Sequence, residues 1–219
     1  ILCLVLSSMG TNANPQTESG LQKHSTQPLA SSQTQEPWWK TAIFYELYPR
    51  SFADGTDDGM GDIPGITSKL DYLKSIGVGA IWITPFFPSP QVDFGYDISD
   101  YRAIAPEYGT MADFDKLLDE AKKRDIKIVL DFVMNHTSDK HAWFKASRSS
   151  RKDPKRDWFV WRDGKNGGPP NNWQALFGHS AWKFDRKTKQ YYYHFFYPEQ
   201  PDLNWRNPEV RKAMYDAAQ

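Results

Sequence analysis

The sequence has almost no cysteine, and this limits the chemistry that its fold can use. Cys3 is the only cysteine among the 219 residues, so the chain cannot form an internal disulfide. A zinc site built from several cysteines is excluded for the same reason. Because Cys3 lies among the first few residues, the rest of the chain also offers no thiol nucleophile.

Excess charge of either sign is missing as well. The chain has 27 Lys and Arg residues and 27 Asp and Glu residues, which gives a formal net charge of zero. Proteins that bind nucleic acid usually carry a basic patch or stripe. The short charged run over residues 151–156 is more typical of a solvated loop. Nucleic acid is therefore not expected as a partner.

Aromatic residues are absent from residues 1–37, although the chain has 9 Trp, 11 Tyr and 13 Phe. The apolar run Ile1–Leu6, followed by small residues up to position 13, predicts the remnant of a secretory signal peptide over residues 1–13. A truncated membrane anchor is the alternative. Residues 14–37 are rich in Gln, Ser, Thr and Asn and predict a disordered linker. A secreted protein, or one on the extracellular face of the plasma membrane, is expected.

Strand and helix patterns alternate from Ile43 onward. Three short apolar runs predict strands over Ile43–Tyr48, Ala80–Thr84 and Ile126–Asp131. The strands are about forty residues apart with a helix in each interval, which favours parallel βα units.

Local signals place the helices between these strands. An apolar stripe predicts one helix that ends at Gly77 and is formed by Ile66, Leu70, Leu73 and Ile76. Thr110 and Asp113 have the spacing of a capping box at the start of the next helix.

The alternation stops after His136. Residues 137–203 are polar and aromatic, with a turn-rich stretch near Pro169 and a β-prone stretch over Gln190–Tyr197. This composition indicates an insertion in place of another βα unit. Asn207 and Pro208 then predict the N-cap and first residue of a helix.

Four stretches carry a family resemblance, namely residues 38–66, 92–101, 131–144 and 200–208. The third begins Asp-Phe-Val-Met-Asn-His at the end of a predicted strand, and the fourth begins Gln-Pro-Asp-Leu-Asn. In this order they resemble the α-amylase family of glycoside hydrolases. The resemblance is strongest to its α-glucosidase branch, which includes oligo-1,6-glucosidases and insect maltases.

The resemblance implies an α/β fold, the (β/α)8 TIM barrel, with a domain B inserted after the third strand. Residues 38–136 would form the first three strands, residues 137–203 domain B, and residues 204–219 the return to the barrel as its third helix. The family's nucleophile and acid/base would lie beyond Gln219, so the chain is expected to be an N-terminal piece. The implied enzyme is an exo-acting, retaining α-glucosidase that acts on maltose, sucrose or short oligosaccharides.

The resemblance also assigns roles to individual side chains. Asp131 matches an acid that organises the site without attacking the sugar. Substrate-binding roles are implied for Asp93, Tyr96, His136, Phe177, Phe196 and Gln200. Without the family match, the aromatic residues would be interpreted as core packing and His136 as structural.

A separate constellation predicts a calcium site before the second strand. Its oxygen ligands are Asp54, Thr56, Asp58, the Met60 carbonyl and Asp62. Oxygens at alternate positions with Gly59 at the sixth resemble an EF-hand loop, although Gly65 replaces the glutamate of the twelfth position. A plain Asp-rich turn is the alternative. The α-glucosidase branch uses the matching loop for structural calcium.

One other function class is compatible with the motifs. Heavy subunits of animal amino-acid transporters resemble the same family and act as membrane-tethered ectodomains without hydrolysis. Membrane attachment through residues before the linker would fit that role. Against it, Asp93, Tyr96 and His136 keep residue types that bind sugar, for which a scaffold has no physical need. A small oligosaccharide is the expected partner.

Overall fold

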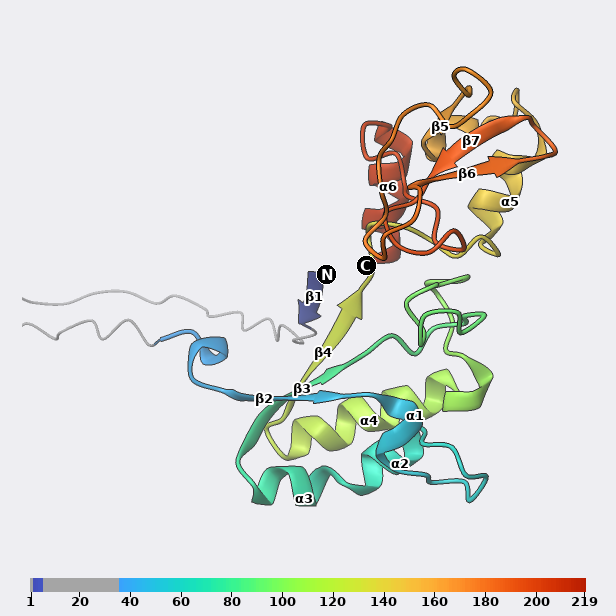
Figure 1. Ribbon diagram of the computed structural model, residues 1–219. Coiled ribbons are helices and arrows are strands. Elements are labelled where there is room, and N and C mark those ends of the chain that lie inside the picture. Colours follow the sequence, from blue (N-terminus) through green and yellow to red (C-terminus); the bar gives the residue numbers. More distant parts are fainter. Residues whose placement is uncertain (1, 6–35) are drawn as a thin grey trace, which may run out of the picture.

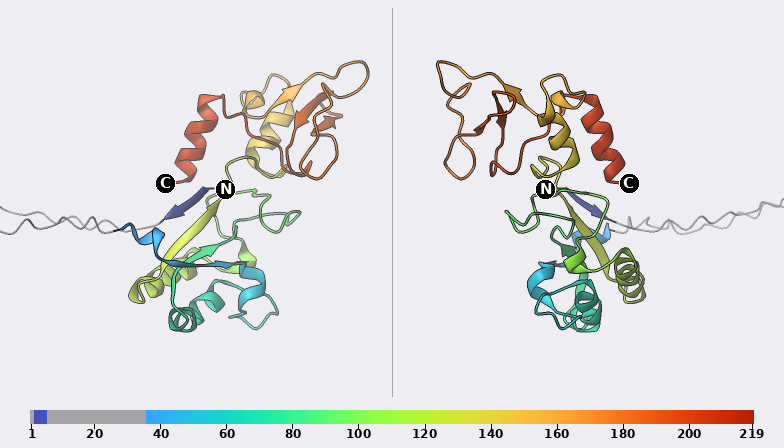
Figure 2. Two further views of the ribbon diagram at one scale, coloured as in Figure 1. Left: turned by 60° about the vertical axis from the view of Figure 1, so that its left-hand side comes forward. Right: turned by 90° about the vertical axis from the view of Figure 1, so that its right-hand side faces the viewer.

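The computed structural model describes residues 2–5 and 36–219. The chain forms two lobes, which Figures 1 and 2 show one above the other. Residues 38–136 make the lower lobe, in which helices cover a face of a sheet. Residues 137–219 make the upper lobe, which contains a second, smaller sheet.

Three parallel strands form the centre of the lower lobe. They are β2 (Ile43–Leu47), β3 (Val78–Ile83) and β4 (Lys127–Phe132). In the register, Ile83 lies opposite Leu47 on one side and Leu130 on the other. The predicted parallel βα arrangement is therefore confirmed, with boundaries shifted by a residue or two.

A fourth strand, β1 (Leu2–Val5), pairs antiparallel with β4, so that Leu2 lies opposite Phe132. No strand was expected at this position. Residues 1 and 6–35, which include most of the predicted linker, lie outside the described residues. The signal peptide stays a prediction.

The helix predicted to end at Gly77 is two helices. They are α2 (Ile63–Ser68) and α3 (Leu70–Ser75), and they follow the short α1 (Pro49–Phe52). The break falls at Lys69, whose backbone (φ −101°, ψ 4°) leaves the helical range. Ile66, Leu70 and Leu73 are buried as predicted, but Ile76, which follows the last residue of α3, is 48% exposed.

The next helix, α4 (Met111–Lys123), begins as predicted. Thr110 accepts a hydrogen bond from the Asp113 N–H and the Asp113 carboxylate accepts one from the Thr110 N–H, so the capping box is complete. The pairing satisfies two N–H groups that the first turn would otherwise leave free. Phe114 and Leu117 then pack into the core of the lower lobe.

Domain B is a small sheet packed on a helix. The strands are β5 (Trp161–Arg162), β6 (Trp182–Asp185) and β7 (Gln190–Tyr193), arranged antiparallel in the order β5-β7-β6. Against them lies α5 (Ala142–Ser149), whose Phe144 stacks on Trp161 at 5.7 Å between ring centroids. The insertion predicted after the third parallel strand is thus a compact unit with an aromatic core.

The chain ends in α6 (Pro208–Ala217), which is opened by the predicted N-cap Asn207. Val210 and Met214 are buried in the same core as Phe144 and Phe132, so this core joins domain B to the end of β4. Three short 3-10 helices complete the described part, at Trp38–Lys40, Pro106–Tyr108 and Arg156–Trp158. None of the helices in it is long and apolar enough to cross a membrane.

Gly65 allows a close approach between α2 and the chain after α1. A Cβ atom at this position would overlap the Ala53 carbonyl oxygen, and backbone cannot yield as a flexible side chain can. We expect Gly65→Ala to lower the free energy of unfolding by about 1 to 3 kcal/mol, as in other overpacked sites. Thermal unfolding followed by circular dichroism measures the change.

Gly168→Ala is the matched control, because a Cβ there meets nothing closer than 3.8 Å. It should leave the melting temperature nearly unchanged. Equal melting temperatures for the two variants would contradict the close approach at Gly65.

Candidate functional site

The residues predicted to bind substrate meet in one pocket of about 290 Å³ between the two lobes. The segments after β3 and β4 supply its floor and one wall, and domain B supplies the other wall. Its lining consists of Asp93, Tyr96, Val133, Met134, Asn135, His136, Phe177 and Phe196. Five of the six predicted substrate-binding residues are among them, and Gln200 is not.

The loop after β3 is shaped by the buried carboxylate of Asp97. Its Oδ1 accepts hydrogen bonds from the Ser89 hydroxyl at 2.8 Å and the Asp93 N–H at 3.1 Å, and its Oδ2 accepts one from the Val92 N–H at 3.1 Å. A fully buried carboxylate is stable when several donors of this kind surround it. Asp97 therefore fixes the backbone from which Asp93 extends.

Gly95 allows the same loop to turn beside the end of β3. Its φ is +101°, and a Cβ atom there would lie 2.6 Å from the Pro85 carbonyl oxygen. Both conditions require glycine. The turn places Tyr96 close enough for its N–H to donate to the Asp93 carbonyl at 2.9 Å.

Asp93 is held from the side of domain B as well. Its Oδ2 accepts a hydrogen bond from Gln200 Nε2 at 2.9 Å. Gln200 is completely buried and lies behind Asp93, outside the pocket lining. Gln200 was expected to form part of the pocket wall. It instead contacts the lining residue Asp93, because both the oxygen and the nitrogen of its amide are bonded to protein.

Tyr96 connects the pocket to Asp131 beneath it. The phenol donates to Asp131 Oδ2 at 3.0 Å, and Asp131 is buried at the end of β4. Burial, together with the neighbouring Asp131 carboxylate, raises the pKa of Tyr96, so the phenol stays protonated. Burial also raises the pKa of Asp131. Its other oxygen, Oδ1, has no hydrogen-bond partner within the described part of the chain.

His136 is neutral and is bonded on both ring nitrogens. Nε2 lies 3.1 Å from the Tyr96 carbonyl oxygen, which can only accept, so Nε2 carries the hydrogen. The Asn135 amide lies 3.2 Å from Nδ1 and acts as donor there. Burial lowers the pKa of His136 to about 4. The ring therefore lines the pocket while its polar atoms hold the surrounding loops together.

Asn135 extends this network to the end of domain B. Its amide also donates to Asp202 Oδ2 at 3.1 Å, and the Phe195 N–H donates to Asp202 Oδ1 at 2.8 Å. Burial raises the pKa of Asp202 to about 7 in spite of these two donors. Sequence reasoning had given no role to Asp202.

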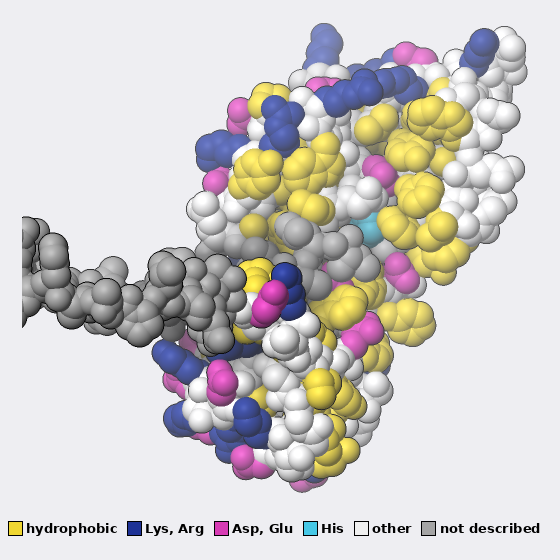
Figure 3. Space-filling view, turned by 90° about the vertical axis from the view of Figure 1, so that its left-hand side faces the viewer, with side chains coloured by type: hydrophobic (Ala, Val, Ile, Leu, Met, Phe, Trp, Pro, Cys, Tyr) yellow, Lys and Arg dark blue, Asp and Glu magenta, His cyan; other side chains and the backbone are white. Residues whose placement is uncertain are grey.

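Aromatic side chains of domain B form the outer wall. The ring centroids of Phe196 and His136 are 5.1 Å apart, and Phe177 stacks on Tyr197 with 4.6 Å between ring centroids. Phe177 is 51% exposed, which is unusual for so large an apolar ring. Hydrophobic side chains gather on this lobe in the space-filling view (Figure 3). Val133 and Met134 complete the lining; they lie in the Asp-Phe-Val-Met-Asn-His motif, but no role was predicted for either.

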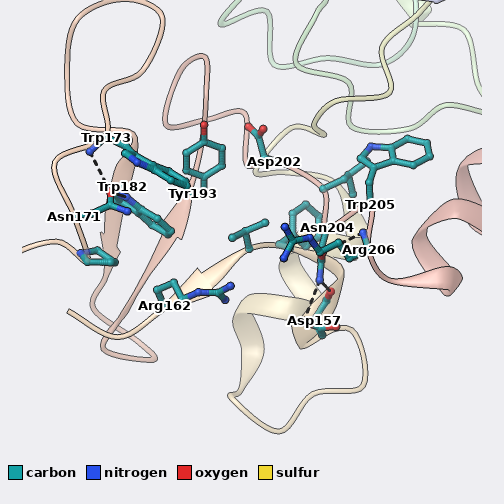
Figure 4. Close-up of a pocket in the computed structure, with 14 residues that line it drawn as sticks. Asp157, Arg162, Asn171, Trp173, Trp182, Tyr193, Asp202, Asn204, Trp205 and Arg206 are labelled. Carbon is teal, nitrogen blue, oxygen red and sulfur yellow. Dashed lines mark hydrogen bonds between the residues drawn. The ribbon is translucent and has the colours of Figure 1, made fainter. Parts of the chain in front are cut away.

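Domain B also carries a larger groove of about 680 Å³. Figure 4 shows Trp173, Trp182 and Tyr193 on one side of it and Trp205 on the other. None of the predicted site residues lines this groove. The predicted substrate-binding residues are therefore found at the smaller pocket.

The predicted calcium loop is closed by its own hydrogen bonds. Asp54 accepts from the N–H groups of Thr56 and Asp57 through Oδ1 and from Gly59 through Oδ2, at 2.7–2.9 Å. The bond from the Gly59 N–H is the main reason that the pKa of Asp54 is lowered, so this carboxylate is ionised at neutral pH. Gly59 has φ +88°, which glycine adopts without strain.

The remaining carboxylates of this loop are bonded in a similar way. Asp58 accepts from the Met60 N–H at 2.8 Å, and Asp62 accepts from the Thr56 hydroxyl at 2.8 Å and the Gly65 N–H at 2.6 Å. Across residues 2–5 and 36–219, no three acidic, histidine or cysteine side chains converge as a metal site requires. The loop is rich in oxygen but does not present a preformed cage.

The pocket has the features of a site for one sugar ring. A carboxylate, a phenol and aromatic side chains surround it, and such groups bind hydroxyls and the apolar face of a sugar. Asp93 is its single acidic residue. Retaining glycoside hydrolysis needs two carboxyl groups about 5 to 5.5 Å apart, and this lining contains only one.

Comparisons with known proteins agree with this geometry. Over 179 residues the chain is 56% identical to a probable oligo-1,6-glucosidase of Bacillus subtilis, which covers 82% of this chain and 32% of that protein. The structure of the isomaltulose synthase SmuA from Protaminobacter rubrum has a TM-score of 0.81 at 55% identity, covering 83% of this chain and 32% of that one. A MutB mutant solved with sucrose has a TM-score of 0.81 at 56% identity, covering 83% and 33%.

The chain thus spans about a third of the length of these relatives. Their agreement extends to the fold, since structures with this TM-score and identity share its first barrel units and its inserted domain. The sequence model of the alpha amylase catalytic domain matches residues 46–219. The chain therefore belongs to the alpha-amylase family.

Proposed function

We propose that the protein carrying this sequence is an α-glucosidase that removes terminal α-linked glucose from maltose, sucrose or short oligosaccharides with retention. The observation that supports this most is the orientation of Asp93. Its carboxylate is bonded by Gln200 and its backbone by Asp97, at the wall of a pocket for one sugar ring. A carboxylate held in the wall of a pocket for one sugar ring favours the end of a sugar chain over its middle.

The relatives support the substrate class. One is named as an oligo-1,6-glucosidase, and a structural neighbour was solved with sucrose. Sucrose and the oligosaccharides that an oligo-1,6-glucosidase cleaves both end in an α-linked glucose. A single glucose is the unit that a pocket of this size accommodates. Another neighbour is an isomaltulose synthase, so the measurement of products must separate hydrolysis from isomerisation.

A non-catalytic ectodomain of a transporter heavy subunit is the alternative function. Such a scaffold needs a stable surface but no buried hydrogen bonds that orient a pocket carboxylate. Gln200 and Asp93 lie 107 residues apart in the sequence and are nevertheless bonded side chain to side chain. We therefore favour the enzyme.

We further propose that the loop over residues 54–62 binds a structural calcium ion. Asp54 Oδ2 and Asp58 Oδ1 each accept one N–H of the loop, so each keeps a second lone pair for a metal. The N–H groups that donate to Asp54 hold its carboxylate in a turn of the length that calcium loops use.

Asp93→Ala should lower kcat/KM on maltose strongly in the protein that carries this sequence. The variant leaves the hydroxyls of the terminal glucose without their charged acceptor, a loss on the order of 2 to 4 kcal/mol. Steady-state kinetics measures it. Asp100→Ala, which changes an exposed aspartate of the same segment, is the control. A change of less than about twofold for Asp93→Ala would show that Asp93 does not bind the sugar.

The 219-residue chain, purified alone, should hydrolyse no α-glucoside. The physical reason is that one carboxylate lines its pocket, whereas retention requires a nucleophile and an acid. Release of glucose from maltose and of the chromophore from an aryl α-glucoside measures activity. Turnover that disappears in Asp93→Ala would refute this expectation.

Calcium should raise the melting temperature, because a ligand that binds only the folded state stabilises it. Asp58→Ala should remove this dependence on calcium, whereas the control Asp115→Ala, on the exposed face of α4, should keep it. Thermal melts with calcium and with a chelator provide the measurement. Identical melts of the unmodified protein under both conditions would count against the site.

A further inference from the structure

Gln200 is the one predicted sugar-binding residue that the structure withdraws from the pocket. Its side chain is fully buried, while Phe177 and Phe196 of the same domain remain in the lining. A residue in this position cannot bond a sugar directly. Its effect on substrate must pass through the groups that it touches.

The amide of Gln200 has only one possible orientation. The Tyr197 N–H donates to its oxygen at 3.0 Å, and a backbone N–H cannot accept, so the oxygen must lie on that side. The nitrogen then faces Asp93 and donates to Oδ2 at 2.9 Å. Gln200 therefore presents a donor, and never an acceptor, to the Asp93 carboxylate.

This donor leaves one oxygen of Asp93 for a ligand. No residue of the described part donates to Oδ1, whereas Oδ2 is taken by Gln200. A carboxylate that could rotate freely would lose conformational entropy on binding a sugar hydroxyl. Because Gln200 already holds Oδ2, the Asp93 carboxylate loses less conformational entropy when a sugar binds.

We infer that Gln200 is a positioning residue, which orients Asp93 from domain B and so couples the docking of this domain to sugar recognition. The inference rests on the proposed α-glucosidase function. It assigns domain B two separate contributions. Its aromatic side chains wall the pocket, and its buried amide aligns a carboxylate that belongs to the barrel.

Gln200→Glu tests this role with almost no change in shape. The oxygen that accepts from Tyr197 is kept, but the donor toward Asp93 becomes a second carboxylate oxygen. We expect kcat/KM on maltose at neutral pH to fall on the order of tenfold, since two like charges in contact push Asp93 away from its alignment. Gln174→Glu places the same charge on an exposed glutamine of domain B and should have no such effect.

The pH profile separates positioning from a general structural role. Below about pH 5 the introduced carboxyl can hold a proton and donate it to Asp93, so the deficit in kcat/KM should shrink. The titratable groups around this pair include Glu46, Tyr96, Asp97, Asp131, His136 and Asp202, which are the same in both proteins. The ratio of the two profiles therefore reports the new contact.

A second substitution separates a structural role from a positioning role, because the two roles predict different recovery of melting temperature and kcat/KM. Asp93→Asn in the Gln200→Glu background restores a hydrogen bond between the two side chains in the reverse direction. We expect the melting temperature to recover while kcat/KM stays low, because the sugar has lost its charged acceptor. Recovery of both would contradict the positioning role.

Gln200→Met covers the case in which the buried charge of Gln200→Glu prevents folding. It adds no charge, removes the donor, and should also lower kcat/KM. If the unmodified protein turns over maltose and neither Gln200 variant changes kcat/KM more than about twofold, the positioning role is wrong while the proposed function stands. If the unmodified protein turns over no α-glucoside, the proposed function fails and this role fails with it.

Discussion

The parallel pairing of β3 with β4 is the constraint on which the pocket depends. In this register Ile83 lies opposite Leu130, so both strands end at one edge and their following segments begin side by side. The segment after β3 carries Asp93 and Tyr96, while Asp131 lies at the end of β4 and the segment after β4 leads to His136. A shift of one residue would turn the side chains of β4 to its other face and separate Asp131 from the Tyr96 phenol.

A network of partly buried polar contacts joins domain B to this edge. Gln200 reaches Asp93, while Asn135 links His136 to Asp202. Such contacts are stable because each donor meets an acceptor, and leaving one unpaired costs more than the pair contributes. The lobes are thus held in one relative arrangement by groups that tolerate little displacement. The apolar core that includes Val210 and Met214 holds the two lobes together by burying hydrophobic surface. The polar network fixes their relative orientation.

Much of this arrangement could be predicted from the sequence, wherever the signal is local. The capping box of Thr110 and Asp113 and the N-cap at Asn207 depend on residues a few positions apart, and both are confirmed. The break at Lys69 was missed because an apolar stripe continues across it, and only packing against the sheet requires the change of direction. Family motifs located the pocket residues, but spacing could not show that Gln200 would lie behind Asp93.

The roles within the pocket follow from contacts that no short stretch encodes. Both nitrogens of His136 are bonded to protein, so the ring joins the loops after β3 and β4, and its contact with a sugar stays a prediction. Asp97 resembles a second acid beside Asp93, yet its burial and its three donors make it the support of the loop. Two carboxylates four residues apart thereby differ in function because one is saturated with donors and the other keeps an oxygen free.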